Sequence, residues 1–195
     1  MVCSKLKLLT EEIRTCTHCV DKLPFEPNPI VRPSSQAKIL IIGPAPGIKV
    51  HQTSISWNDT SGNTLREWMG IARDVFYDDN RIAVMPMGFC YPGKGKSGDL
   101  PPTPACTPMW HSTLLGLMPR IELTLLIGMY AQKYYLQSVK KKNLTDTVRE
   151  WKLYSPRFLP MPHPSPCNKM WLKKNPWFEL EVVPVLRKKI MKLVK

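Results

Sequence analysis

Two short apolar runs, each followed at once by a glycine, constrain the fold of this chain more than any other feature. They are the strand candidates Lys38–Ile42 and Ile121–Ile127. Short, mostly apolar runs that end at a glycine are typical of strands that are buried on both faces of a parallel sheet. Arg81–Met87 is a third candidate, and the brief stretch Leu159–Pro162 comes late in the chain. Such strands need helices packed on both sides of their sheet.

Helices are expected between and around these strands. The segments concerned are 4–15, 61–73, 129–139 and 177–194. Ser61 is the expected N-cap of the second helix, and Pro184 should either kink the last helix or lie in its first turn. The apolar faces predicted for the first, second and last of them comprise Leu6, Leu8, Leu9, Ile13, Leu65, Trp68, Met69, Ala72, Leu180, Val183, Leu186, Ile190 and Leu193.

This alternation predicts an α/β fold, a three-layer α/β/α sandwich around a short, mostly parallel four-stranded sheet, in a single domain over residues 1–195. The 20 prolines, against about ten for an average chain of this length, predict long loops, the longest of them Gly88–Pro108. No stretch approaches the ~18 consecutive apolar residues of a membrane helix, and Met1–Lys7 is too polar to open a signal peptide. We therefore expect a cytoplasmic monomer with no membrane partner.

Charge points to the class of partner. The chain has 28 Lys and Arg against 15 Asp and Glu, a net charge of +13. Such an excess favours a polyanion, above all nucleic acid, through phosphate contacts and counterion release. The alternative is a surface that serves only solubility.

Four of the six cysteines are spaced as Cys16-x2-Cys19, then 70 residues, Cys90, then 15 residues, Cys106. Disulfides are not expected in a chain without a secretory signal. A redox role is disfavoured because a thioredoxin-like CxxC motif sits at a strand-to-helix turn, whereas this one follows a helix. Structural zinc normally takes two close pairs, yet four thiolates can hold either zinc or an iron-sulfur cluster. Unrelated buried cysteines are the remaining alternative.

The first candidate strand ends in Gly43-Pro44-Ala45-Pro46-Gly47, at the place where open α/β sheets bind ligands. The backbone N–H groups of a loop without bulky side chains can bind an anionic or carbonyl oxygen. Trp57-Asn58-Asp59 follows ten residues on. Trp57 could stack on a base, and Asp59 could orient water or stabilise a cation. A core tryptophan and a helix-capping aspartate are the structural alternatives.

A second loop, His163-Pro164-Ser165-Pro166-Cys167-Asn168, holds a histidine between prolines that restrict its backbone. His163 could donate a hydrogen bond to a leaving-group oxygen, although a loop histidine is more often simply exposed. The two loops can share one rim only if their strands are neighbours in a parallel sheet.

On these residues the chain resembles the uracil-DNA glycosylase superfamily, and most closely its iron-sulfur branch, family 4. Gly43–Gly47 is similar to the family's first motif, His163-Pro164-Ser165 to its second, and the four spaced cysteines to its cluster ligands. Without gaps, Trp57 falls on the base-stacking aromatic and Ser61-Gly62 on the small-residue and glycine pair that follows it. The resemblance implies a 4Fe-4S cluster on Cys16, Cys19, Cys90 and Cys106, with zinc or no metal as the alternatives.

The resemblance further implies a base-excision glycosylase that hydrolyses the N-glycosidic bond of uracil or another deaminated base, rotated out of DNA into a pocket between the two loops. His163 and the amides of Gly43–Gly47 would stabilise the base anion, and Asp59 the sugar cation. The same loop, with Trp57 and Asn58, would bind the base. The residues expected to contact DNA are Ser165 and Asn168.

The chain departs from the family in its polar groups. Pro44 stands where the first motif carries glutamate, Ile48–His51 replaces the acidic run after it, and Val84–Met87 offers no asparagine to read the base edge. Two alternatives therefore stay open. One is a nucleic-acid-binding protein of the same fold with weak or no catalysis, and the other is an enzyme acting on a nucleoside or nucleotide, which would have no need of a charge of +13.

Overall fold

The structure, a computed structural model that describes residues 2–96 and 98–195, has a four-stranded sheet at its centre. The strands are β1 (Ile39–Ile42), β2 (Ile82–Val84), β5 (Leu123–Ile127) and β6 (Phe158–Met161). Their order is β2-β1-β5-β6 and each neighbouring pair is parallel. The carboxyl ends of the strands therefore lie along one edge of the sheet.

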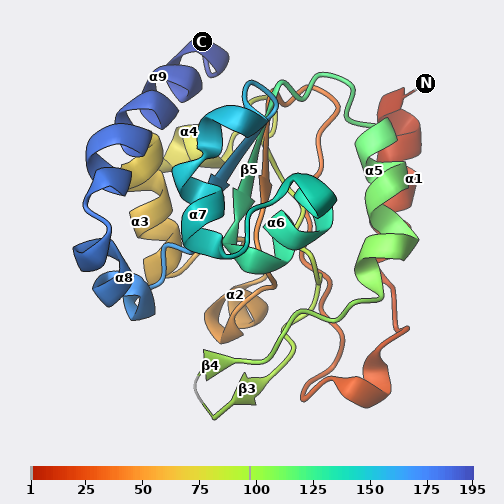
Figure 1. The fold of residues 1–195 in the computed structure, drawn as a ribbon. Coiled ribbons are helices and arrows are strands. Elements are labelled where there is room, and N and C mark those ends of the chain that lie inside the picture. The colour runs from red at the N-terminus through yellow and green to blue at the C-terminus, as the bar shows by residue number, and fades with distance from the viewer. Residues whose placement is uncertain (1, 97) are drawn as a thin grey trace.

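Helices cover both faces of the sheet (Figure 1). The helices packed on one face are α3 (Thr60–Met69), α4 (Arg73–Tyr77), α7 (Leu144–Arg149) and α9 (Val183–Leu193). Those on the other are α1 (Val2–Arg14), α5 (Ser112–Gly116) and α6 (Gly128–Leu136). The predicted three-layer sandwich is confirmed. Within the described ranges, no helix is both long enough and apolar enough to cross a membrane.

Strand geometry explains why the sheet has two apolar faces. Successive side chains of a strand point to opposite sides, so Ile39 and Ile41 join the core beneath α3 and α9, whereas Leu40 and Ile42 join the core beneath α1 and α5. Pro160 is tolerated inside β6 because β6 is an edge strand. A proline there can lack its N–H on the side that forms no hydrogen bond to a neighbouring strand.

The second helix begins and ends differently from the prediction. Its N-cap is Asp59, not Ser61, because an Asp59 carboxylate oxygen accepts a 2.7 Å hydrogen bond from the amide of Gly62. The helix stops at Met69 because Gly70 adopts a left-handed conformation, with φ of 67°, and caps it. Ala72 consequently lies beyond the helix and is exposed.

Two residues predicted on apolar faces point to solvent instead. Leu8 is 66% exposed, because Leu6, Leu9 and Ile13 are spaced by three and four residues and Leu8 falls off their stripe. Leu180 is 74% exposed, because residues 178–182 wind as a π-helical turn, which changes the facing of each side chain before α9 begins. Of the two alternatives predicted for Pro184, a kink or a place in the first turn of the last helix, the second is confirmed, since Pro184 lies in the first turn of α9.

The region predicted as one long loop contains a small hairpin. Strands β3 (Lys94–Gly95) and β4 (Gly98–Asp99) pair antiparallel, and α2 (Ile48–Thr53) follows the loop after β1. Both lie at the lower end of the molecule in Figure 1, beyond the carboxyl ends of the sheet. Two-residue strands carry no period that a sequence pattern could reveal, so the hairpin was missed.

Candidate active site

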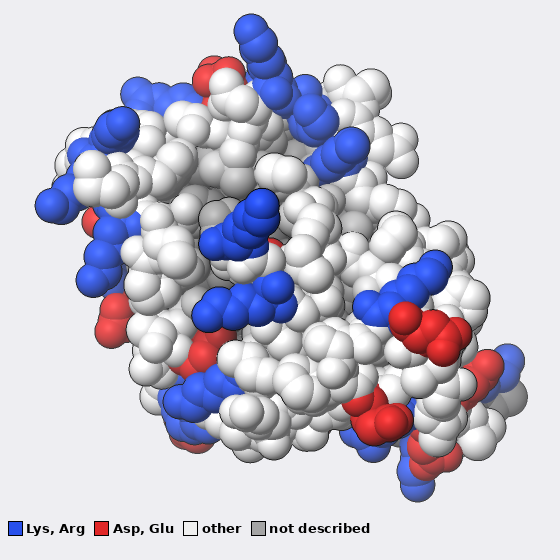
Figure 2. Space-filling view, turned by 90° about the horizontal axis from the view of Figure 1, so that it is seen from below, with Lys and Arg blue, Asp and Glu red and all other residues white. Residues whose placement is uncertain are grey.

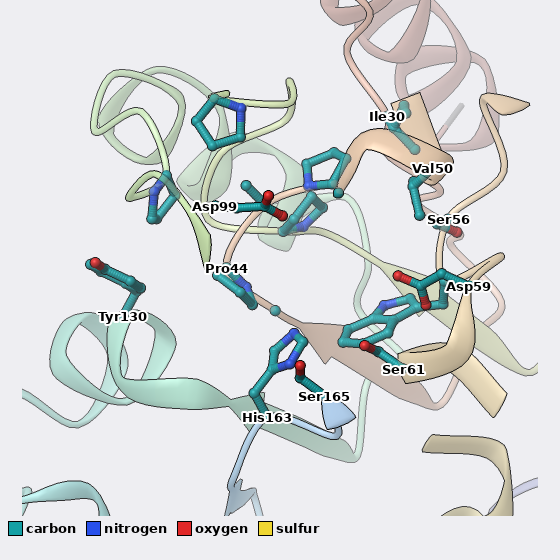
Figure 3. A pocket seen from close by; sticks show the side chains of 18 of the residues that line it. Ile30, Pro44, Val50, Ser56, Asp59, Ser61, Asp99, Tyr130, His163 and Ser165 are labelled. Atoms are coloured by element: carbon teal, nitrogen blue, oxygen red, sulfur yellow. The ribbon is translucent and has the colours of Figure 1, made fainter. Parts of the chain in front are cut away.

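A pocket of about 450 Å³ lies at the carboxyl edge of the sheet (Figure 3). The chain runs from β1 to β2 on one side, while β5 pairs with β1 on the other. Such a switch point between strands is where open α/β sheets bind ligands. The pocket is lined by the Gly43–Gly47 loop, by Trp57 and Asp59, and by His163 and Ser165.

The structure brings the two predicted loops together, but not through neighbouring strands. Strand β5 lies between β1 and β6, so that part of the prediction is wrong. Trp57 links the two loops: its indole ring packs against Gly43 and stacks on the His163 ring, with centroids 5.7 Å apart and an interplanar angle of 29°. The amides of Met87 and Gly88 hold the carbonyls of Gly43 and Pro44 at 2.8 and 2.9 Å, which steadies the first loop.

Trp57 occupies a place that two glycines make available. A Cβ on Gly43 would lie 2.8 Å from the indole ring, and a Cβ on Gly62 would lie 1.8 Å from the Trp57 carbonyl oxygen. Arg66 donates to that same carbonyl at 3.3 Å. The Trp57 backbone has φ of 57°, a left-handed conformation that is unfavourable for a bulky residue. Strained residues of this kind persist only where the surrounding structure holds them, and they are common at functional sites. The contacts with Gly43, Gly62 and Arg66 therefore hold Trp57 in the pocket wall.

Asp59 has one oxygen in a structural role and one facing the pocket. Its Oδ1 caps α3, as the capping alternative predicted. Its Oδ2 would lie 4.0 Å from a Cβ on Gly47. The carboxylate therefore stays available on the pocket side even though it caps the helix.

His163 is partly exposed in the pocket wall. Burial lowers the pKa of its ring from the ordinary value, and the nearby Asp59 carboxylate opposes this in part. The imidazole is therefore neutral at neutral pH and carries one N–H that can be donated. The Asn168 amide donates to the His163 carbonyl at 2.7 Å, which fixes the loop around the histidine.

Of the remaining predicted site residues, Ser165 lies at the pocket, whereas Asn168 and Asn58 do not line it. Ser165 lines the pocket while its hydroxyl accepts from the Cys167 amide at 3.2 Å. Asn168 and Asn58 are not among the pocket-lining residues of the described chain. The Asn58 side chain accepts from Arg73 at 3.0 Å instead, outside the base-binding set in which the sequence placed it.

Tyr130 and Asp99 are among the pocket residues that the sequence did not predict. Tyr130 comes from α6 directly after β5, and Asp99 comes from the β3–β4 hairpin. Desolvation raises the pKa of Asp99 from the ordinary value, and Asp59 adds to this. The available signal for Asp99 was an acidic residue in the loop between Cys90 and Cys106.

The four spaced cysteines converge on a second, small cavity of about 20 Å³. The Phe89 amide donates to the Cys106 sulfur at 3.4 Å, and burial raises the pKa of Cys90 to about 12. Over residues 2–96 and 98–195, no three His, Cys, Asp or Glu side chains converge tightly enough for one metal ion. Four thiolates at one cavity can hold either zinc or an iron-sulfur cluster, so the donor set fits both groups.

Fold and pocket together define an α/β protein with a pocket between two loops at the carboxyl edge of a parallel sheet. A family model for the uracil DNA glycosylase superfamily matches residues 30–187, and the chain belongs to this superfamily. The matched range contains every pocket residue named above, as well as Cys90 and Cys106, but begins after Cys16 and Cys19.

Proposed function

We propose that this protein is a DNA glycosylase that hydrolyses the N-glycosidic bond of uracil or another deaminated base. The observation that supports this most directly is the stacking of His163 on Trp57 at the wall of a pocket floored by the Gly43–Gly47 loop. A pocket of about 450 Å³ is within the usual range for small planar ligands. Enzymes that act on a base in DNA rotate it out of the duplex into a pocket of this kind.

The chemistry follows from the charges that form when the bond breaks. The base leaves as an anion and the sugar becomes an oxocarbenium-like cation, so each needs a group of opposite character. The neutral His163 ring can donate its N–H to a carbonyl oxygen of the base. Trp57 holds the base by stacking, which contributes roughly 1–3 kcal/mol in comparable sites. The two Asp side chains at the pocket are the nearest anions for the sugar.

The face around the pocket suits a polyanion. Figure 2 views the molecule from below, the end at which β3, β4 and α2 lie in Figure 1. Lys and Arg side chains cross the middle of this face, and most of the visible Asp and Glu lie toward its rim. Together with the net charge of +13, this favours phosphate contacts, and Ser165 would add one at the pocket.

Cys16, Cys19, Cys90 and Cys106 would hold a 4Fe-4S cluster in this proposal. The cluster would supply a structural cross-link rather than take part in bond cleavage, because its cavity is lined by none of the residues that line the pocket. Binding would tie the segment after α1 to both ends of the loop that carries the β3–β4 hairpin. The iron-sulfur branch of the superfamily is thus the assignment we favour for this chain.

The test is incubation of the purified protein with labelled oligonucleotides that carry uracil, hypoxanthine or a thymine mismatch. Formation of an abasic site in any of them supports the proposal. DNA binding without release of any base would favour the alternative that Pro44 suggests, a binding protein that has lost catalysis. Cleavage of free deoxyuridine with none in DNA would favour a nucleoside-cleaving enzyme.

A further inference from the structure

The first loop of this chain carries no acidic residue, although the proposed reaction needs an anion near the sugar. Pro44 occupies the middle of the loop, and the helix that follows begins Ile48-Lys49-Val50-His51. The carboxylates at the pocket are instead those of Asp59 and Asp99. They reach the same place from segments 40 residues apart: a Cβ on Gly47 would lie 3.5 Å from Asp99 Oδ2 and 4.0 Å from Asp59 Oδ2.

Of these two aspartates, Asp99 is the one without a structural task. Asp59 Oδ1 holds the first turn of α3 at 2.7 Å. Asp99 receives one long hydrogen bond, 3.5 Å from the Tyr91 hydroxyl. Among the described residues, no Lys or Arg nitrogen forms an ion pair with it, although Lys94 lies opposite it in the hairpin.

Asp99 lies at the mouth of the pocket, where the sugar of a base bound in the pocket would lie. Asp99 is exposed to solvent although it lines the pocket, so it stands at the mouth. In Figure 3 its carboxylate extends from the hairpin over the loop that carries Pro44. A base that enters the pocket leaves its sugar and phosphates at the mouth, because they stay joined to the DNA strand. DNA bound over the mouth would also exclude water there, and the attraction between a carboxylate and a cation is stronger where water is excluded.

We infer that Asp99 is the catalytic carboxylate of this site, a role that rests on the proposed glycosylase function. In the reaction the C1′–N bond breaks and its electron pair leaves with the base, while Asp99 stabilises the cation that forms at the sugar. A water oxygen then bonds to C1′, and its proton passes to the Asp99 carboxylate. Solvent returns that proton to the base anion. Asp59 keeps α3 and Trp57 in place.

The experiment measures single-turnover base release, on the substrate that the wild type cleaves best, for Asp99→Asn, Asp59→Asn and Asp74→Asn. Asparagine is as good an N-cap as aspartate, so Asp59→Asn removes charge but preserves the helix. Asp74 is exposed in α4 and lines no pocket wall, which makes it the control for loss of one negative charge. Asp99→Ala is a second variant in case the amide disturbs the hairpin.

Asp99→Asn should slow base release by about 10²- to 10⁴-fold, the usual contribution of a positioned acid or base, with DNA affinity equal to that of Asp74→Asn. The wild-type rate should also fall at acid pH as Asp99 is protonated, and this limb should vanish in the variant. The groups facing Asp99 that shape this limb are Tyr91, Lys94 and Asp59.

Three results would overturn the inference. Wild-type rates in Asp99→Asn and Asp99→Ala would refute it while leaving the glycosylase function intact. A large loss confined to Asp59→Asn would assign the role to Asp59. If the wild type releases no base from any DNA, the proposed function fails and this inference fails with it.

Discussion

Replacing Gly62 with alanine should displace Trp57 from the pocket wall. A Cβ at position 62 would lie 1.8 Å from the Trp57 carbonyl oxygen and 2.6 Å from its carbon, both backbone atoms. Real Cβ contacts are essentially never shorter than 3.0 Å, so the start of α3 or the Trp57 turn has to move by about 1 Å. Neither can move freely, because the Asp59 cap and Arg66 hold both.

The magnitude follows from two opposing effects. Overpacking of this kind costs about 1–3 kcal/mol, and so severe an overlap places it at the upper end. Alanine favours the helix over glycine by about 0.5–1 kcal/mol, which leaves a net loss of about 2 kcal/mol. At this chain length, each kcal/mol lowers the melting temperature by about 2–4 °C.

Urea unfolding of Gly62→Ala and Gly116→Ala measures this difference. Gly116 is the matched control because it also lies in a helix, yet a Cβ there meets nothing within 4 Å. Gly116→Ala should leave stability unchanged or raise it slightly. Gly62→Ala should in addition weaken binding to base-modified DNA, because Trp57 loses its stacking position. Equal stability in the two variants, with wild-type DNA affinity in both, would refute the reasoning.

The remaining predictions concern single groups. His163→Ala should slow base release by about 10²- to 10³-fold while equilibrium DNA binding stays near wild type. Asp59→Ala should lower the free energy of unfolding by about 0.5–2 kcal/mol, whereas Asp59→Asn should not, as thermal melts would show. Burial lowers the pKa of His111 to about 4, below the pKa of a histidine in the unfolded chain. The free energy of unfolding should therefore be highest above about pH 6.5 and should fall as pH drops toward 4, by up to about 3 kcal/mol. Stability measured against pH should have a smaller slope over that window in His111→Asn. Cys106→Ser should lose iron and the brown colour of anaerobically purified protein, and a colourless wild type containing zinc would contradict the cluster.

The strands and the two motif loops could be predicted because their signals are local. Apolar runs such as Leu123–Ile127 can be buried only in a sheet covered on both faces, and a glycine directly after such a run marks its end. The motif at His163 was recognisable for the same reason, since its prolines lie within three residues of the histidine along the chain. The errors arose where local geometry departs from a regular period, as at Leu180, which a π-helical turn points to solvent.

The residues of the pocket that come from distant segments could not be predicted in this way. The sequence marks Gly62 by its resemblance to a family motif but does not show why a glycine is needed there, because what demands it is the backbone of Trp57 folded against it. The sequence also offered Asp59 as the pocket carboxylate, since it lies close to Trp57 along the chain. Only the structure shows that a two-residue strand brings Asp99 beside the same loop.

The sequence by itself therefore determined the layers, the carboxyl edge of the sheet as the place of the pocket, and the identity of the two loops. These depend on burial periods and turn chemistry that each act over a few residues. The tertiary structure decided which carboxylates face the pocket and how Trp57 is held there. Both depend on contacts between segments tens of residues apart, whose approach is set by the packing of the whole chain rather than by the residues beside them.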